Sequence, residues 1–339
     1  MNSFLEDLST FALSLDAGDH KLFDSSVHWV MLANGDADFH DNVIFFGFAE
    51  RDNDPILVAK VPRLAENGWM LQTEYDHLVE LWNCIGEEAS HFVPKPIAMT
   101  SLQQRPLLMV SYVPGKSLAR LSRKAFWGNS DQVSALAQEA AHTLRHLNQL
   151  TERPSDPGDV LSPRFAEKAA TFRELFQTTS DEDAMLADLV NISETAVGRA
   201  THKVIIQGDF WHGNMIRGGK QGGLKLIDWQ FARWSADVSM DVYFFLLAGA
   251  LSASGDVPEQ QRARAAFHVL SGWRENVIPA YLSAYGMPER YVLLPQKYGM
   301  LMCCVEKAVR PALEFGYSHS DDLIWRHLFA ELTSWPDPD

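Results

Sequence analysis

Two acidic residues and one amide follow short apolar runs in the middle of the chain. The run at 204–206 leads to Asp209, and Asn214 follows Asp209 by five positions. A second apolar run, 224–227, leads directly to Asp228. Phosphoryl transfer requires a carboxylate that orients an acceptor hydroxyl and oxygen ligands that hold Mg²⁺ against nucleotide phosphates. The three side chains therefore form a candidate set for that chemistry.

A glycine-rich turn at 218–223 separates the two apolar runs and predicts a β-hairpin that brings their polar ends together. An Asp, an Asn five positions later and a second Asp on a later segment follow the protein-kinase template. We predict that Asp209 orients or deprotonates the acceptor hydroxyl, and that Asn214 and Asp228 bind Mg²⁺. The alternative is a hairpin with capping polar residues, which explains Asp209 alone better than it explains all three.

The two stretches read QGDFWHGN (207–214) and LIDWQ (226–230). They resemble the motifs of the aminoglycoside phosphotransferase and choline kinase-like family. The aromatic residue after Asp209 and the Gln two positions after Asp228 are similar to its ecdysteroid-kinase-like branch. The resemblance implies a bilobal protein-kinase-like fold and ATP-dependent phosphorylation of a small-molecule hydroxyl. The family usually has His at the position of Gln207. In the family this His mostly supports the loop and takes no part in the reaction.

The elements that position these residues fall into two regions. Apolar runs separated by turns predict strands at 28–32, 42–48, 56–61, 96–99 and 107–112, and periodicity predicts a helix at 69–82. Helical patterns follow at 131–150, 163–199 and 240–332, interrupted by a small β region at 203–229. We therefore predict an α+β fold with a small, sheet-rich, nucleotide-binding N-lobe (1–112). A larger, mainly helical C-lobe (113–339) would carry catalysis and bind the acceptor.

One lysine of the first region lies inside an apolar strand. Residues 1–110 carry 17 acidic and 6 basic side chains, and Lys60 alone among these bases lies within an apolar run. Kinase-like sites place a cation on the nucleotide phosphates and hold it with a carboxylate from a helix. We predict that Lys60 has this role with Glu74 as its partner. Glu80 is the alternative, because helix register decides which of the two faces inward. A solvated strand edge and helix face would explain these residues without any function.

The segment 107–115 reads LLMVSYVPG and is similar to the hinge of the family. A hinge recognises adenine through backbone donors and acceptors, and we place this contact at Ser111 to Val113. An ordinary edge strand is the alternative. The acidic, glycine-poor turn at 35–42 is the candidate phosphate cover. Asp241, at the start of a predicted helix, is expected to support the catalytic loop.

Composition excludes several classes of protein. The chain has 339 residues, of which 46% are hydrophobic and 22% charged, as in ordinary globular proteins. A net charge of −15 argues against a general nucleic-acid binder. The longest apolar run, 242–251, is shorter than the ~20 residues of a membrane span. Three cysteines without metal-ligand spacing, and an N-terminus without a basic start, predict a cytoplasmic protein.

We therefore predict a small-molecule O-kinase that uses ATP and Mg²⁺ and whose partner is a hydroxyl-bearing small molecule. Residues 251–339 carry 11 acidic and 8 basic side chains, so nothing favours a polycationic acceptor over a lipid, steroid-like or sugar-like one. Gln207 and the glycine-poor turn motivate the alternative of a non-catalytic, nucleotide-binding pseudokinase that acts through partners. A protein kinase is disfavoured, because Trp229 and Gln230 follow Asp228 in place of Phe-Gly. No pattern indicates an oligomeric state.

Overall fold

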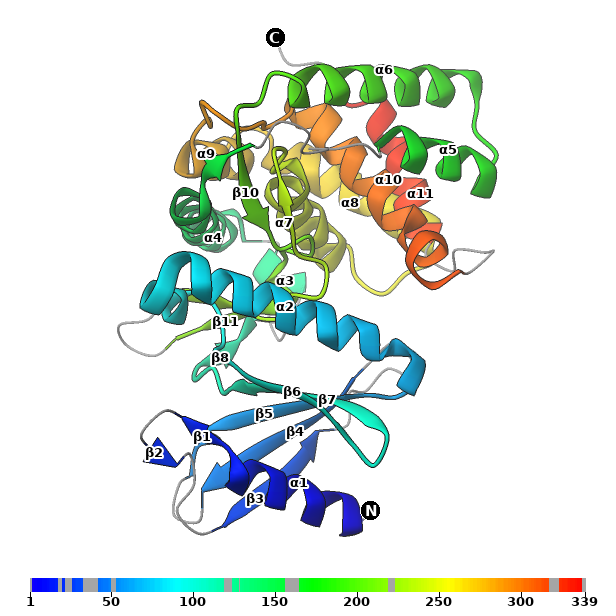
Figure 1. Ribbon diagram of the computed structural model, residues 1–339. Coiled ribbons are helices and arrows are strands. Elements are labelled where there is room, and N and C mark those ends of the chain that lie inside the picture. The colour runs from blue at the N-terminus through cyan, green and yellow to red at the C-terminus, as the bar shows by residue number, and fades with distance from the viewer. Residues whose placement is uncertain are drawn as a thin grey trace. The chain divides into compact units, whose positions relative to one another are not determined.

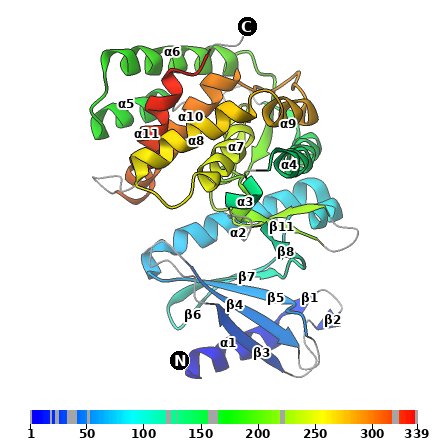
Figure 2. The same cartoon turned by 180° about the vertical axis from the view of Figure 1, so that it is seen from behind.

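The computed structural model describes residues 2–17, 20–21, 26–32, 42–49, 53–118, 124–127, 129–155, 165–218, 223–316 and 323–336. The chain divides into two compact units, Met1–Lys116 with Ile216–Phe231 and Ser117–Met215 with Ala232–Asp339. The first unit is rich in strands and the second is mainly helical (Figures 1 and 2), which confirms the predicted α+β fold class. The assignment of nucleotide binding to 1–112 and of catalysis to 113–339 stays a prediction.

The first unit is built on a five-stranded antiparallel sheet in the order β3-β4-β5-β7-β6. Its strands are β3 (Val27–Leu32), β4 (Asn42–Ala49), β5 (Leu57–Pro62), β6 (Pro96–Leu102) and β7 (Arg105–Ser111). Helices α1 (Asn2–Ser14) and α2 (Gly68–Ile85) lie on opposite sides of this sheet (Figure 1). Shorter elements complete the unit: β1 (Asp16–Ala17), β2 (His20–Lys21), η1 (Ala65–Asn67) and η2 (Gly86–His91).

Alternation along β5 decides where Lys60 points. Leu57, Ala59 and Val61 are buried in the core that also contains Leu8 of α1. Successive side chains of a strand point to opposite faces of the sheet. Lys60 therefore lies on the other face, which α2 covers.

A second sheet, in the order β12-β11-β8, contains β8 (Lys116–Ser117), β11 (Met215–Arg217) and β12 (Leu224–Leu226). The N–H of Leu226 donates to the carbonyl of Phe92 at 2.6 Å, next to the end of η2. This bond ties the strand that leads to Asp228 to the rest of the first unit.

The second unit is formed mainly by helices. They are α3 (Lys124–Trp127), α4 (Ser130–Thr151), α5 (Phe165–Leu175), α6 (Ser180–Val197), α7 (Ser239–Ala253), α8 (Glu259–Trp273), α9 (Val277–Tyr285), α10 (Gln296–Phe315) and α11 (Leu323–Thr333). Helix α7 is apolar around most of its circumference and almost entirely buried, as expected for a central helix. In the part of the chain that the structure describes, no helix is both long and apolar enough to cross a membrane.

A small sheet in the order β13-β10-β9 lies within the helical unit and contains β9 (Arg153–Pro154), β10 (His202–Ile206) and β13 (Arg233–Ser235). Strand β10 is almost completely buried, which suits its run of branched apolar residues. It delivers the chain into the loop that contains Asp209, and α7 begins shortly after β13. These two segments together build the loop described next.

Candidate active site

The loop after β10 is anchored by the carboxylate of Asp241, in the first turn of α7. The N–H groups of Gln207 and Gly208 donate to its Oδ2 and Oδ1 at 2.7 and 2.8 Å. Burial raises the pKa of Asp241 to about 6, against the opposing effect of these two hydrogen bonds. The two bonds confirm that Asp241 supports the loop. They use only the backbone N–H groups of Gln207 and Gly208, so the side chain of Gln207 takes no part in this anchor.

Gly208 has a φ of +74°, in the left-handed region that glycine adopts most easily. Gly208→Ala should therefore destabilise the protein by about 1–2 kcal/mol and displace the loop. Gly272→Ala is the matched control, because Gly272 lies in α8 with nothing within 4 Å of an added Cβ. The control should be neutral or raise stability by about 0.5 kcal/mol. Urea unfolding measures both, and an equal effect of the two substitutions would contradict the expected strain.

Both carboxylate oxygens of Asp209 have partners within the second unit. Oδ2 accepts a hydrogen bond from Nδ2 of Asn214 at 2.8 Å, and the same Nδ2 donates to the carbonyl of Asp209 at 3.1 Å. Oδ1 forms an ion pair with Lys307 and lies 3.6 Å from Nη1 of Arg310. Two of the predicted site residues, Asp209 and Asn214, are therefore in direct contact.

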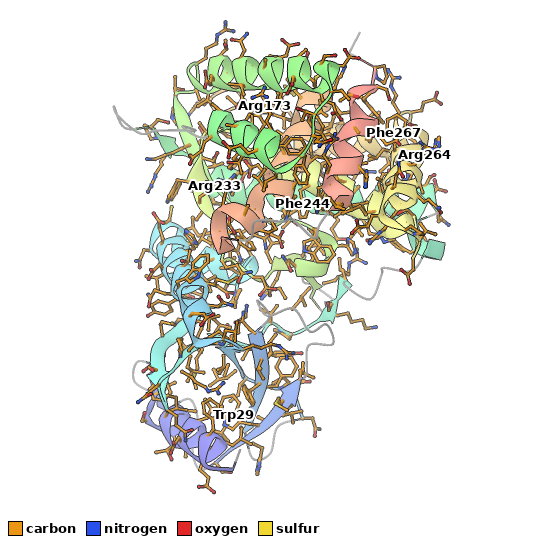
Figure 3. All side chains as sticks on the ribbon, turned by 90° about the vertical axis from the view of Figure 1, so that its right-hand side faces the viewer. Trp29, Arg173, Arg233, Phe244, Arg264 and Phe267 are labelled. Carbon is orange, nitrogen blue, oxygen red and sulfur yellow. The ribbon has the colours of Figure 1, made fainter. Side chains whose placement is uncertain are left out.

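Sequence reasoning missed Lys307 and Arg310, which lie three positions apart on α10. Arg310 also donates from Nη2 to the carbonyl of Gly208 at 2.8 Å. The ammonium of Lys307 lies 3.7 Å from the ring centre of Phe244. Phe244 belongs to α7 and is labelled in Figure 3. Their position among apolar residues of a predicted helix was a signal that could have identified them. Lysine and arginine side chains are rarely buried in such surroundings without a charged partner.

The charges around Asp209 shift its pKa and that of Lys307. Burial alone would raise the pKa of Asp209, but Lys307 and Arg310 outweigh burial and lower it below its ordinary value. Burial, with a contribution from Arg310, lowers the pKa of Lys307 to about 8 against the attraction of Asp209. At neutral pH Asp209 is therefore ionised and most of the Lys307 population is protonated.

A second cluster of charges lies within the first unit. The ammonium of Lys60 lies 2.8 and 2.9 Å from the two carboxylate oxygens of Glu74 and also forms an ion pair with Asp228. Lys60 and Glu74 are buried, and the structure thus selects Glu74 over Glu80 as the partner. Burial alone would lower the pKa of Lys60, but Asp228 and Glu74 raise it above its ordinary value. Burial raises the pKa of Glu74 against the attraction of Lys60.

Asp228 has a φ of +59°, which is uncommon for a residue with a side chain. The next residue, Trp229, makes two contacts with α2. The N–H of Trp229 lies 3.5 Å from Oε1 of Glu74, and the carbonyl oxygen of Trp229 lies 3.1 Å from Nδ1 of His77. The Asp228 side chain is 38% exposed, so its carboxylate is open to solvent on one side. Backbone strain of this kind is concentrated at functional sites.

The predicted hinge residues begin at Ser111, the last residue of β7. The N–H of Ser111 donates to the carbonyl of Lys95, and that of Tyr112 donates to the carbonyl of Ile56, both at 2.9 Å. Val113 makes no hydrogen bond to any residue that the structure describes. Among the described residues, nothing therefore competes with a ligand for the backbone groups of Val113. The predicted phosphate cover at 35–42 lies outside the described residues, except for Asn42.

The candidate Mg²⁺ ligands are Asp228 in the first unit and Asn214 in the second. Because Nδ2 of Asn214 is committed to Asp209, its carbonyl oxygen is the atom left for a cation. Carboxylate and amide oxygens suit Mg²⁺, which usually takes few ligands from protein. Within the described residues no three or more His, Cys, Asp or Glu side chains are grouped to share a metal ion.

His212 and Trp229 belong to the packed interior. The ring of His212 is fully buried with its centre 4.7 Å from that of Trp127, and burial lowers the pKa of His212 to about 4. Trp229 is also fully buried, and its indole N–H donates to the carbonyl of Leu226 at 3.1 Å. At neutral pH His212 is an uncharged packing residue.

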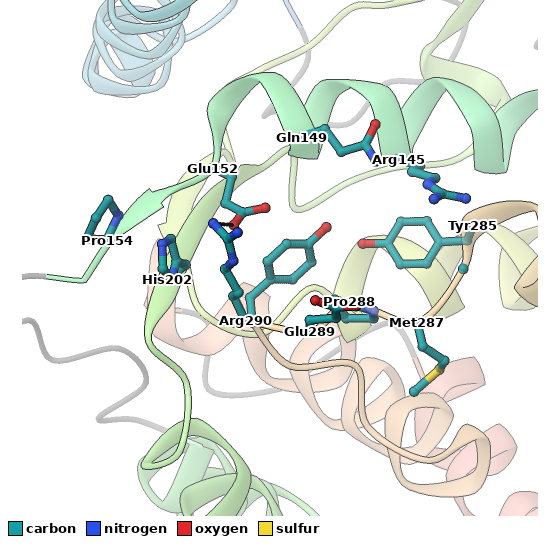
Figure 4. Close-up of a pocket in the computed structure, with 12 residues that line it drawn as sticks. Arg145, Gln149, Glu152, Pro154, His202, Tyr285, Met287, Pro288, Glu289 and Arg290 are labelled. Atoms are coloured by element: carbon teal, nitrogen blue, oxygen red, sulfur yellow. Dashed lines mark hydrogen bonds and ion pairs between the residues drawn. The ribbon is translucent and has the colours of Figure 1, made fainter.

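A hollow of about 540 Å³ lies elsewhere in the second unit (Figure 4). Arg145, Tyr285 and the ion pair between Glu152 and Arg290, whose Nη1 and Oε1 are 3.2 Å apart, line it. His202, at the first residue of β10, also lines it, whereas Asp209 follows the other end of that strand. None of the predicted site residues contributes to this hollow.

Comparison with known proteins relates the chain to one family. Residues 69–286 match the model of the phosphotransferase enzyme family. This range includes Glu74, both motifs and Asp241. Among curated proteins, no sequence matches the chain.

Solved structures share the fold. A putative fructosamine-3-kinase from Haemophilus somnus is 13% identical, with 98% of each chain covered and a TM-score of 0.54. Macrolide 2'-phosphotransferase MphH from Brachybacterium faecium is 16% identical, with 100% of each chain covered and a TM-score of 0.50. Aminoglycoside phosphotransferase APH(3'')-Id from Streptomyces rimosus, in complex with ADP and streptomycin, is 17% identical, with 99% of this chain and 98% of that one covered and a TM-score of 0.50. The chain therefore has the protein-kinase-like fold of these enzymes.

Proposed function

The chain belongs to the phosphotransferase enzyme family, and from this premise we propose that it transfers the γ-phosphoryl group of ATP to a hydroxyl of a small molecule. The observation that carries the proposal is the buried ion pair of Lys60 with Glu74, joined by Asp228. A kinase-like site needs such a lysine on the phosphates and a carboxylate that holds it. A buried charge cluster adds little net stability by itself, which favours a functional reason for it.

The nucleotide contacts are proposed for residues of the first unit. Lys60, oriented by Glu74, neutralises phosphate charge. The free backbone groups of Val113 recognise adenine, and Ser111 positions them, because its N–H is held by Lys95 at 2.9 Å and its hydroxyl accepts from the N–H of Lys95 at 2.8 Å.

Asp228 and Asn214 are the proposed ligands of Mg²⁺. When bound, the ion neutralises phosphate charge that develops as the phosphoryl group leaves. Asp228 supplies a partly exposed carboxylate oxygen, and Asn214 supplies the amide oxygen that its contact with Asp209 leaves open.

Asp209 is the proposed catalytic residue. Its lowered pKa makes it a weak base, so its main role is to accept the hydrogen bond of the acceptor hydroxyl and to orient the attacking oxygen. The transferred proton passes to this carboxylate late in the step, because the transition state of phosphoryl transfer is loose and the hydroxyl is little activated before it. The catalytic gain then comes from positioning and from preorganised charges.

We also propose a branch of the family and a cellular location for the protein. Phe210 after Asp209, and Gln230 two positions after Asp228, favour a place near the ecdysteroid-kinase-like branch. A cytoplasmic location is proposed because an ATP-dependent kinase needs a compartment that supplies ATP.

The test is a transfer assay with γ-labelled ATP and a panel of neutral polyols, macrolides, sterol-like alcohols and amino sugars. We expect label to appear on at least one hydroxyl compound and to vanish when EDTA removes Mg²⁺. Binding of Mg²⁺-ATP without transfer to any compound would contradict the proposal. It would favour the alternative of a pseudokinase that acts through partners.

A further inference from the structure

The second unit places its own cations on the carboxylate that an acceptor must reach. Lys307 forms an ion pair with Oδ1 of Asp209, and Arg310 lies 3.6 Å from the same oxygen. These are not loose surface side chains, because they are only 10% and 11% exposed. The carboxylate therefore carries its counter-charge before any acceptor binds.

Both cations are held by further contacts. Arg310 donates to the carbonyl of Gly208 at 2.8 Å and lies 3.8 Å from Glu314. Lys307 packs its ammonium 3.7 Å from the ring centre of Phe244. These contacts hold both cations beside Asp209.

The neighbouring carboxylate of Glu306 is paired mainly with two other cations. Its Oε1 lies 2.8 Å from Nζ of Lys168, and its Oε2 lies 3.1 Å from Nη2 of Arg233. Asp241, another nearby carboxylate, is committed to the backbone N–H groups of the loop. Asp209 is thus the carboxylate at which an acceptor cation would have to compete.

We propose that Lys307 and Arg310 take the place of acceptor ammonium groups at Asp209, so that the acceptor is a hydroxyl compound with no cation beside its reacting hydroxyl. This inference rests on the proposed function and narrows its substrate class. A polycationic acceptor would approach an already neutralised carboxylate and two like charges, which disfavours binding. A neutral acceptor needs to insert only a hydrogen-bond donor.

Streptomycin is the probe, and its affinity is measured by calorimetry without any turnover. The wild-type protein should show no saturable binding at millimolar streptomycin. Lys307→Met should gain affinity by about tenfold or more, because it removes one competing cation and keeps the apolar stem against Phe244. Lys307→Gln is the second variant if the first one melts early. Arg264→Gln is the control, since Arg264 is an exposed cation of α8 that pairs with Glu331 at 3.3 Å.

Three results of this experiment would contradict the proposal. Tight binding of streptomycin to the wild-type protein would overturn it. So would a failure of both Lys307 variants to gain affinity while folded, or an equal gain in Arg264→Gln. The hydroxyl-panel assay remains separate, because it reports phosphate transfer and not cation binding. Loss of transfer and loss of cation discrimination can therefore be told apart.

Discussion

Asp209→Asn should lower kcat for phosphate transfer by about 10²–10⁴-fold while nucleotide affinity stays unchanged. The amide keeps the size of the carboxylate and can still accept the hydrogen bond from Asn214. It cannot accept a proton from the acceptor hydroxyl, and it places a weaker dipole beside the attacking oxygen. Single-turnover transfer with the best compound of the hydroxyl panel measures the change.

The fold should survive this substitution. Lys307 loses its counter-ion, but burial has already brought its pKa to about 8, so the amine can become neutral at small cost. Asp188→Asn on α6 is the matched control, because Asp188 is exposed and the same chemical change there should leave transfer intact. Equal transfer by wild-type and Asp209→Asn proteins would remove Asp209 from its proposed role.

The pairing of Lys60 with a helix carboxylate could be predicted because its signals are local. A lysine in an apolar strand, followed by a helix that carries acidic residues, limits the candidate partners of Lys60 to Glu74 and Glu80. The observed helix, Gly68–Ile85, also begins and ends close to the predicted 69–82. Helix register then decided the choice, and register depends on how α2 packs on the sheet, which spacing alone does not fix.

The partners of Asp209 could not be predicted in this way. Lys307 and Arg310 lie 98 and 101 positions further along the chain, on a helix whose place is set by packing against α7. The apolar pattern of 240–332 predicts one long helical region. The turns that divide this region decide which face of α10 meets the loop that contains Asp209. Apolar periodicity identifies the helices, but long-range charge pairing emerges only from their tertiary arrangement.

The left-handed backbone of Asp228 is a further feature that spacing does not indicate, because it breaks the local preference of a non-glycine residue. The contacts of Trp229 with Glu74 and His77 hold the neighbouring backbone in place. Sequence reasoning fails most readily at positions where tertiary contacts override local preference, and functional sites are rich in them.

Lys60→Met should remove nearly all phosphate transfer, by roughly 10²–10³-fold, because one preorganised charge on the phosphates is lost. It should also destabilise the protein by about 3 kcal/mol, since Glu74 is left buried without its cation. Lys60→Arg keeps the charge and should retain more stability. Lys116→Met is the surface control, because Lys116 is exposed and should affect neither quantity.

The destabilisation of Lys60→Met should depend on pH. The pKa of Glu74 is already raised in the folded state, and the loss of Lys60 raises it further. The folded variant then binds more protons than the unfolded chain, so its free energy of unfolding falls as pH rises. Urea unfolding should find the variant closer to wild type at pH 5 than at pH 8. An identical deficit at the two values would contradict the assignment of the cost to Glu74.

The double variant Lys60→Met/Glu74→Met separates folding from function. A buried ion pair replaced by apolar side chains of similar volume is often neutral for stability, and Asp228 is exposed enough to remain hydrated. The double variant should therefore regain most of the stability lost in Lys60→Met and still transfer no phosphate. Recovery of both stability and transfer would show that the pair serves packing alone, whereas recovery of stability without transfer ties Lys60 to the nucleotide.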